Sequence, residues 1–336
     1  MHMHRLFAVF LAVCLFLSGC VIKNGPKKFE KSYFLAFNTY TTITGYAVSQ
    51  EAWDVVADEL YDQLLEYHQL FDIYNDYPGI ANLKTVNDNA GIAPVQVDQR
   101  IIALLLDCKT YYEASGGLVN AAMGSVLRLW HDARTAGLAD PEHAALPDAD
   151  ALAEAAKHTS WDGVIIDAEN STVYLSDPAM SLDVGAIAKG WATQRVAEQA
   201  PAGVLLSVGG NICATGPKPD GSAWNVGVQD PDNASGYLRT CKIECGSLVT
   251  SGDYQRYYTV GGKHYHHIID PATGYPAQHW RSVTIRCQNA GIADVLSTAL
   301  FLLPLEEGKA LLTQFSAEAL WVDYAGNIYQ SDGFGG

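Results

Sequence analysis

The sequence predicts an α+β fold in which antiparallel sheets and helices are mixed along the chain. Short turn segments at residues 168–171, 261–262 and 325–326 each separate two runs of strand composition, and so predict β-hairpins. Other segments repeat apolar residues at helical spacing. Because strands and helices do not alternate regularly, we do not expect a doubly wound parallel sheet.

In the first half of the chain, the clearest element is an amphipathic helix over residues 50–74, since Trp53 and Leu60 recur at helical spacing. Asp98 can cap a second helix over residues 99–114. The other expected elements are a strand-like run (32–46), a helix or turn (119–130), an exposed Ala/Asp/Pro-rich insert (134–150) and a short helix (151–158).

In the second half, the clearest element is a hairpin of residues 254–258 and 263–269. Gly261 and Gly262 between these runs tolerate the positive φ of a two-residue turn, and Ser251 to Asp253 predicts a turn before them. The other expected elements are a hairpin (164–167 with 172–175), a helix (184–199), strands (204–208, 224–228, 282–286), two helices (292–301, 306–315) and a last hairpin (320–324 with 327–329).

The N-terminus predicts a secreted, lipid-anchored protein. Residues 1–19 combine a basic start, an apolar run and a small-residue ending, as in a signal peptide. Cys20 follows Leu-Ser-Gly, which resembles a bacterial lipobox, so we expect a lipidated Cys20 and a tether over residues 20–32 on the extracytoplasmic face of the cell membrane. An uncleaved anchor and a soluble secreted protein are the alternatives. Residues 33–330 are then the functional domain.

Charge and cysteine content exclude some functions. The chain has 21 Lys and Arg against 37 Asp and Glu, for a net charge of −16, and no basic patch that would neutralise nucleic-acid phosphates. Nucleic-acid binding is therefore not expected, and an anionic ligand needs a few local donors or a metal. Apart from Cys14 and Cys20, the cysteines lack metal-site spacing and are expected to be scattered buried thiols: Cys108, Cys213, Cys241, Cys245 and Cys287.

Asp294, Ser297 and Thr298 are candidate metal ligands, because their spacing places three oxygen donors on one face of an otherwise apolar helix. Hard oxygen ligands suit Mg²⁺. The alternative is a helix cap accompanied by a Thr that hydrogen-bonds its own helix, and on this segment alone that alternative is favoured.

Two other segments carry candidate ligand-binding groups. Asp183 precedes a glycine-containing helix entry and Lys189 lies one turn inside it, an arrangement that offers backbone N–H groups and a positive charge to an anion. His264, His266 and His267 lie at the end of a predicted strand beside an Asp-Pro-Ala-Thr-Gly turn. The histidines indicate either a site or a polar hairpin edge.

Taken together, these segments resemble a known family. Read in order, FNTYTTITGY, FDIYND, SGGLVNAAMGSVLRLW, SLDVGAIAKGWA, SVGGNICATG, TSGDYQRYY, HHIIDPATGYP and ADVLSTAL are similar to the motif series of the ApbE family, the FAD:protein FMN transferases, which are often lipoproteins. The resemblance spans residues 32–324. It implies two intimately packed subdomains with the FAD site between them.

The resemblance also implies roles for individual residues. His267 matches the catalytic histidine, which leaves His264 and His266 as structural or rim residues. Mg²⁺ ligands are implied at Asp294, Ser297, Thr298 and the carbonyl of Ala186. FAD-binding positions are implied at Phe37, Tyr74, Val119, Asn120, Ala121, Asp183, Lys189 and Ile269.

The chain departs from the family pattern at several positions. Phe37 and Asn38 replace Met-Gly, Asn120 replaces an Asp, and Gln194 replaces another Asp in the helix after Lys189. An Asp-to-Asn change keeps the shape but loses a negative charge, so it can alter adenine or ribose contacts. The implied metal and histidine positions are intact.

The implied activity is Mg²⁺-dependent transfer of FMN from FAD to a Thr or Ser hydroxyl of an acceptor protein, with release of AMP. The resemblance suggests a membrane-associated redox subunit as the acceptor. Two alternatives stay open at this stage: an FAD pyrophosphatase that releases free FMN, and a non-catalytic flavin-binding lipoprotein.

Overall fold

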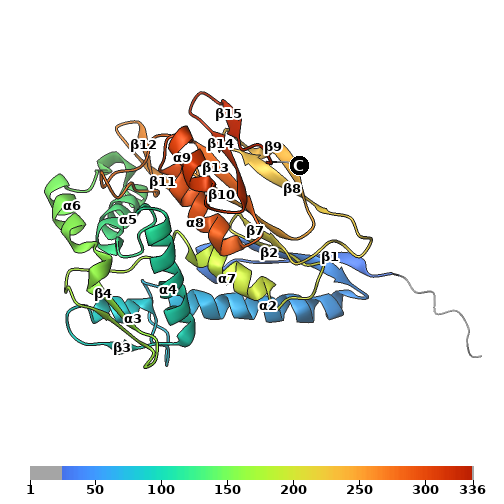
Figure 1. Ribbon diagram of the computed structural model, residues 1–336, viewed down its shortest axis with the longest axis horizontal. Coiled ribbons are helices and arrows are strands. Elements are labelled where there is room, and N and C mark those ends of the chain that lie inside the picture. Colours follow the sequence, from blue (N-terminus) through green and yellow to red (C-terminus); the bar gives the residue numbers. More distant parts are fainter. Residues whose placement is uncertain (1–24, 335–336) are drawn as a thin grey trace, which may run out of the picture.

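An eight-stranded antiparallel sheet organises the molecule (Figure 1). The computed structural model describes residues 25–334. The strand order in the sheet is β1 (Lys27–Tyr33), β2 (Thr41–Ala47), β6 (Leu205–Val208), β7 (Asn211–Ala214), β10 (Gly246–Gly252), β13 (Ser282–Cys287), β14 (Ala317–Val322) and β15 (Ile328–Gln330). Smaller sheets pair β3 (Val95–Gln96) with β5 (Thr172–Leu175) and β4 (Val164–Asp167), β8 (Trp224–Asp230) with β9 (Asn233–Ile243), and β11 (Tyr257–Val260) with β12 (Lys263–His266).

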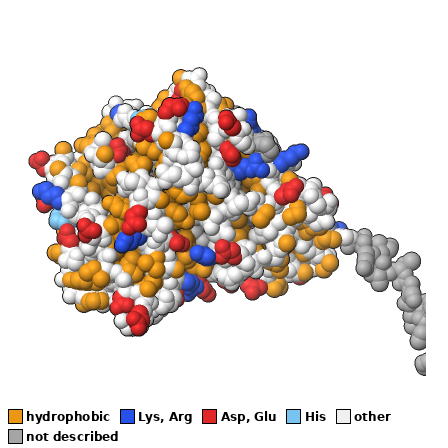
Figure 2. All heavy atoms as spheres, viewed as in Figure 1, with side chains coloured by type: hydrophobic (Ala, Val, Ile, Leu, Met, Phe, Trp, Pro, Cys, Tyr) orange, Lys and Arg blue, Asp and Glu red, His pale blue; other side chains and the backbone are white. Residues whose placement is uncertain are grey.

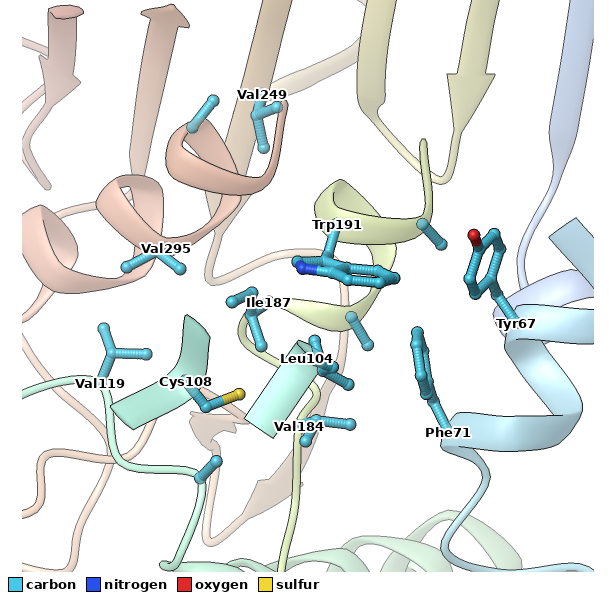
Figure 3. Close-up of a cluster of buried hydrophobic side chains, with 14 of the residues drawn as sticks. Tyr67, Phe71, Leu104, Cys108, Val119, Val184, Ile187, Trp191, Val249 and Val295 are labelled. Carbon is cyan, nitrogen blue, oxygen red and sulfur yellow. The ribbon is translucent and has the colours of Figure 1, made fainter. Parts of the chain in front are cut away.

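Helices cover one face of the main sheet. The described helices are α2 (Gln50–Phe71), α3 (Leu83–Asp88), α4 (Gln99–Ala114), α5 (Gly124–Ala139), α6 (Ala149–Ala155), α7 (Ala188–Ala197), α8 (Ala290–Phe301) and α9 (Leu305–Leu312). Of these, α2, α7, α8 and α9 contact the sheet directly. Trp191 of α7 is central to this layer: Tyr67 and Phe71 of α2 meet its ring edge-on with centroids at 5.6 Å (Figure 3). Such aromatic contacts bury large apolar area.

The opposite face of the sheet is covered by the β8–β9 hairpin. Alternate residues along one strand point to opposite faces. Accordingly, Val249 of β10 joins the helical core, whereas Leu248 packs in a separate cluster with Trp224 and Val226 of β8. A third cluster joins α5 and α6 to the β11–β12 hairpin.

Most expected elements are present, including the α4 helix, the β4–β5 hairpin and the turn at Gly261 and Gly262, where φ is 56° and 80°. The strand-like run 32–46 is two strands, because Phe37 and Asn38 turn the chain with φ of 55° and 52°. Asn tolerates this left-handed region better than most residues. The Tyr61 hydroxyl fixes the turn by accepting from the amides of Leu35 and Ala36 at 2.9 and 3.1 Å.

Other expectations were wrong. Residues 134–139, expected in an exposed insert, continue helix α5. The helix expected from residue 184 begins at Ala188. The region around Ser251 is the end of β10, an inner strand that the Ser-Gly-Asp turn signal concealed. Flanking glycines at 246 and 252 gave this strand the appearance of a loop.

On the face shown in Figure 2, Lys and Arg are dispersed among Asp and Glu and do not form a large region of positive charge. Among residues 25–334, no helix is long and apolar enough to cross a membrane. All the described cysteines are free thiols, and four are buried as expected, whereas Cys245 is exposed. The predicted signal peptide, Cys20 and residues 21–24 lie outside the described residues. The expected tether extended too far, because residues 27–32 belong to strand β1, which pairs with β2 at the edge of the main sheet.

Close contact between α7 and α8 depends on Gly190. A Cβ atom there would collide with the carbonyl oxygen of Ala290 and the Cβ of Asp294. We expect Gly190→Ala to lower the free energy of unfolding by about 1–3 kcal/mol, as overpacking does. The matched control is Gly308→Ala, where the nearest atom, on Trp321, lies 3.6 Å from the added Cβ. That change should raise stability by about 0.5–1 kcal/mol, because alanine favours a helix interior. Urea denaturation of both variants tests this, and equal effects would contradict it.

Candidate functional site

A cavity of about 860 Å³ lies where the main sheet and its helices meet the α5 and β11–β12 region. This volume is at the upper end for small-molecule sites. All but two of the predicted site residues within the described chain line it: Phe37, Tyr74, Val119, Asn120, Asp183, Ala186, Lys189, His267, Ile269, Asp294 and Thr298. The two exceptions, Ala121 and Ser297, are buried behind the wall.

At the sheet end of the cavity, Asp294 is a buried carboxylate with a cation beside it. Its Oδ1 lies 3.7 Å from Nζ of Lys189, and its Oδ2 accepts a hydrogen bond from the amide of Gly190 at 2.8 Å. Burial raises the pKa of Asp294, while Lys189 and the Gly190 amide oppose that rise. The carboxylate is thus held in place from α7 while it lines the cavity.

The amide of Gly190 also determines what the carbonyl of Ala186 can do. In a regular helix this amide would bond the carbonyl four residues earlier, at Ala186. Because the amide donates to Asp294 instead, the Ala186 carbonyl, on the cavity wall, accepts no hydrogen bond from residues 25–334. The N-cap of α7 is Ile187, directly after Ala186, so the helix starts at Ala188 rather than at residue 184.

The hydroxyls on α8 divide into one that faces the cavity and one that does not. Among the described residues, Thr298 makes no hydrogen bond through its side chain and lines the cavity. Ser297 is fully buried, and its Oγ bonds the carbonyl of Asp294 and Oγ of Ser251, both at 2.8 Å. The helix cap is Asn289, so the capping alternative for Asp294 does not apply.

These donors suit a magnesium ion. A carboxylate, a hydroxyl and a free carbonyl are hard oxygen ligands, and Mg²⁺ retains other positions for water or phosphate oxygens. Asp294, Thr298 and the Ala186 carbonyl fit this role in the structure, whereas Ser297 is already engaged. No group of three or more His, Cys, Asp or Glu side chains able to hold a metal occurs in the described chain.

His267 follows β12 and is exposed to the open space of the cavity. Its amide and its Nδ1 both bond the carbonyl oxygen of Arg256, at 3.1 and 3.3 Å. Because a carbonyl only accepts, the proton of the neutral ring is on Nδ1, and Nε2 is the basic nitrogen. Enclosure by the cavity walls and the nearby charge of Arg256 lower the pKa of His267, although access of solvent to the ring moderates this shift.

The other two histidines of the hairpin have structural positions. His266 is 5% exposed, with Nε2 donating to the carbonyl of Ala277 at 2.7 Å and Nδ1 accepting from the amide of Ile268 at 3.2 Å. His264 is exposed and stacks on Tyr257, with ring centroids 4.4 Å apart. Neither has a free ring nitrogen directed at the cavity in the way that His267 does.

The helical end of the cavity contains an aromatic stack. Tyr74 lies flat against His131 of α5, with centroids 4.6 Å apart and its hydroxyl 3.3 Å from Nδ1. Asp183 lies nearby. Enclosure raises the pKa of Asp183, and the Gly185 amide, which donates to it at 2.8 Å, opposes that rise. At this end of the cavity, an aromatic ligand with polar edges can stack on the rings and form hydrogen bonds to the carboxylate.

The segment after Ser-Gly-Gly is held by its own polar contacts. Asn120 donates from Nδ2 to the carbonyl of Thr159 and accepts at Oδ1 from the amide of Ala122, both at 2.9 Å. Ala121 accepts from the amide of Asp183 at 2.8 Å, so it positions that carboxylate from behind. An Asp at position 120 has no N–H to donate to Thr159, which is a structural reason for Asn.

Gln194 also has a structural position, outside the cavity. Its Oε1 accepts from the amide of Ala290 at 2.8 Å, in the first turn of α8, and its Nε2 donates to Glu198 at 3.0 Å. Gln194, which replaces an Asp of the family pattern, therefore stabilises the start of the helix that carries Asp294 and does not line the cavity.

Several polar residues of the cavity had no side-chain role in the sequence predictions, among them His131, Arg134, Asn211 and Arg256. His131 and Arg134 were hidden because the α5 helix was expected to end near residue 130. Their spacing of three places them on one helix face. Asn211 and Arg256 adjoin segments that were singled out, the Gly-Gly turn and the histidine hairpin.

Comparisons with known proteins identify the family of this chain. The model of the ApbE family matches residues 37–321. An FAD:protein FMN transferase of Treponema pallidum is 36% identical to this chain, over 79% of this chain and 76% of the relative. One of Klebsiella pneumoniae is 30% identical, over 78% of this chain and 79% of the relative. The ApbE protein of Thermotoga maritima superposes with a TM-score of 0.81 at 29% identity, covering 92% of this chain and 98% of its own.

A more distant structure, the flavin transferase ApbE of Vibrio cholerae, shares the fold with a TM-score of 0.75 at 21% identity, covering 92% and 99% of the two chains. The predicted α+β class and the motif resemblance are both confirmed. The family match spans every described cavity residue that the motifs singled out. This chain is therefore a member of the ApbE family.

Proposed function

We propose that this protein is an FAD:protein FMN transferase, the activity named for its relatives. The observation that carries the proposal is that one cavity brings together a histidine with a free basic nitrogen and a set of hard oxygen donors beside a lysine. A base and a phosphate-binding centre are what phosphoryl transfer to a hydroxyl requires.

In the proposed reaction, Nε2 of His267 accepts the proton of a Thr or Ser hydroxyl on the acceptor protein. The freed oxygen attacks the flavin-side phosphorus of FAD. The bond from that phosphorus to the bridging oxygen breaks, AMP leaves with the bridging oxygen, and FMN stays on the acceptor as a phosphoester. Lys189 contributes a positive charge near the phosphates, and the Arg256 carbonyl holds the imidazole in the required tautomer.

Magnesium is part of the proposal, with Asp294, Thr298 and the Ala186 carbonyl as its ligands. When bound, the ion neutralises phosphate charge. The Asp294 carboxylate attracts the cation, and its contacts with Gly190 and Lys189 keep it oriented. Tyr74, Asp183, Phe37, Val119 and Ile269 are proposed to contact the flavin and adenine portions of FAD, since all line the same cavity.

The acceptor is proposed to be a membrane-associated redox subunit, and Cys20 is proposed to anchor this protein at the extracytoplasmic face of the cell membrane. Both follow from the motif resemblance and the N-terminal sequence. Fractionation of the full chain and of Cys20→Ala tests the anchor. A Cys20→Ala protein that stays in the membrane fraction would exclude lipidation as its cause.

The decisive experiment incubates the protein with FAD and Mg²⁺, with and without an acceptor domain that carries a Thr at its flavinylation site. We expect covalently bound flavin on the acceptor and one AMP for each FMN transferred, detected by in-gel fluorescence and chromatography. AMP release at the same rate without acceptor, and no flavin on the protein, would instead indicate an FAD pyrophosphatase. Tight flavin binding with no turnover would indicate a binding protein.

The pH dependence of transfer provides a further prediction. A general base must be neutral, so activity should fall as pH drops through the pKa of His267. Enclosure, Arg256, His266, Lys189 and Arg134 all lower that pKa, in that order. We therefore expect the acid limb of kcat/KM for FAD, which reports the free enzyme, to lie below pH 6.5, the ordinary histidine value. An acid limb above that value would contradict the assignment.

A further inference from the structure

Two arginines in the cavity wall stand apart from the other arginines of the described chain. Among residues 25–334, Arg134 of α5 and Arg256, just before β11, have no side-chain hydrogen bond and no ion-pair partner, yet both line the cavity. The other described arginines each have a side-chain polar contact: Arg100, Arg128, Arg195, Arg239, Arg281 and Arg286. Although the chain has 37 acidic residues, these are the two described arginines without a side-chain partner, and both lie in this wall.

Both arginines line the same cavity as His267. Arg256 lowers the pKa of Arg134, and both arginines lower the pKa of His267. Moreover, the backbone of Arg256 is tied to His267 through two hydrogen bonds to its carbonyl. Without a ligand, the two positive charges repel each other and lower the pKa of His267. An anion bound between the arginines and His267 would offset both the repulsion and the lowered pKa.

The position of that anion follows from the proposed reaction, on which this inference rests. The base must lie beside the attacking hydroxyl, and the hydroxyl beside the phosphorus that it attacks. Cations next to His267 are therefore next to the flavin-side phosphoryl group. Lys189 cannot serve this group equally, because its charge is already balanced by Asp294 at 3.7 Å.

The chemistry of the side chains agrees with this position. In phosphoryl transfer, negative charge is spread over the equatorial oxygens of the group in transit. Guanidinium groups present planar pairs of N–H donors that match phosphate oxygens and remain charged at any physiological pH. We propose that Arg134 and Arg256 together bind the flavin-side phosphoryl group of FAD, and of the FMN that is transferred, on the side away from Asp294.

Binding of two flavins that differ only in the phosphate tests this directly. We would measure the Kd of FMN and of riboflavin by flavin fluorescence, without metal or acceptor, for the full chain and for the double variant Arg134→Gln/Arg256→Gln. We expect FMN affinity to fall by roughly 10- to 100-fold, the usual effect of losing charged hydrogen bonds. Riboflavin affinity should not change.

The matched control is Arg128→Gln, on the same helix but outside the cavity, where the exposed Arg128 lies 3.9 Å from Asp132. It should alter neither affinity. Arg256→Lys should recover part of the FMN affinity, since it restores charge but not the planar pair of donors.

Three results would overturn the proposal. The first two are an unchanged FMN affinity in the double variant and an equal loss of affinity for FMN and riboflavin. The third is a rise only in the KM for the acceptor protein, which would mean that the arginines bind a carboxylate of the acceptor. The FMN-to-riboflavin comparison needs no turnover. If the protein transferred no flavin but the double variant still lost FMN selectivity, the proposed function would fail and this inference would stand.

Discussion

Replacing His267 with alanine is expected to abolish FMN transfer while FAD affinity is retained. The ring supplies a basic nitrogen, Nε2, to the cavity, because its Nδ1 is committed to the Arg256 carbonyl. A positioned general base contributes roughly 100- to 10,000-fold to the rate. Single-turnover transfer to the acceptor should therefore slow by about that factor, whereas flavin fluorescence titration should give the wild-type Kd. This split between chemistry and binding is the mark of a catalytic residue.

His264→Ala is the matched control for this prediction. His264 belongs to the same hairpin, but it is exposed, stacks on Tyr257 and does not line the cavity, so transfer should be unaffected. His266→Ala is not a suitable control, because it removes two buried hydrogen bonds and would destabilise the hairpin. If His267→Ala transferred FMN at the wild-type rate, the base would have to be another group.

Local signals were sufficient to predict the parts of the fold that depend on neighbouring residues. Asp98 caps α4 by accepting from the amide of Arg100 at 2.8 Å, and Gly261 and Gly262 have the positive φ that a two-residue turn requires. These features depend on a few adjacent side chains, which the sequence displays directly.

Long-range contacts decided what was missed. Asp294, which lies 104 residues after Gly190, takes the Gly190 amide away from Ala186 in the first turn of α7. No pattern within residues 184–199 contains this information. Likewise, β10 is a strand because β7 and β13 pair with its two edges, although Gly246, Ser251 and Gly252 individually indicate a turn.

In the candidate site as well, local sequence signals identified most residues, and long-range contacts decided the others. The residues that the motifs singled out were largely brought into one cavity, but Ser297 was assigned by proximity in sequence, and only the packing against Ser251 shows that its hydroxyl is engaged. Arg134 was missed because it lies one turn beyond the expected end of its helix. Helix periodicity indicates a face, and the tertiary structure decides what that face meets.

Replacing Asp294 with asparagine is expected to remove most of the Mg²⁺-dependent turnover. The amide keeps the shape and one oxygen that can accept from Gly190, so the α7–α8 contact should persist, but the charge that attracts the cation and balances Lys189 is lost. Loss of a metal's charge stabilisation is worth several kcal/mol, which corresponds to a decrease in turnover of roughly 100- to 1,000-fold. Initial rates measured across a Mg²⁺ titration, together with a thermal melt, separate this effect from unfolding.

Two hydroxyl variants on the same helix sharpen this prediction. Thr298→Val removes a hydroxyl that faces the cavity and makes no hydrogen bond in the described structure, so it should raise the Mg²⁺ concentration needed for half-maximal rate without lowering stability. Ser297→Ala removes two buried hydrogen bonds, so it should lower the free energy of unfolding by roughly 1–3 kcal/mol and leave the Mg²⁺ dependence unchanged. The reverse pattern would make Ser297 the ligand and Thr298 a structural residue. An Asp294→Asn protein with wild-type Mg²⁺ dependence would place the metal elsewhere in the cavity.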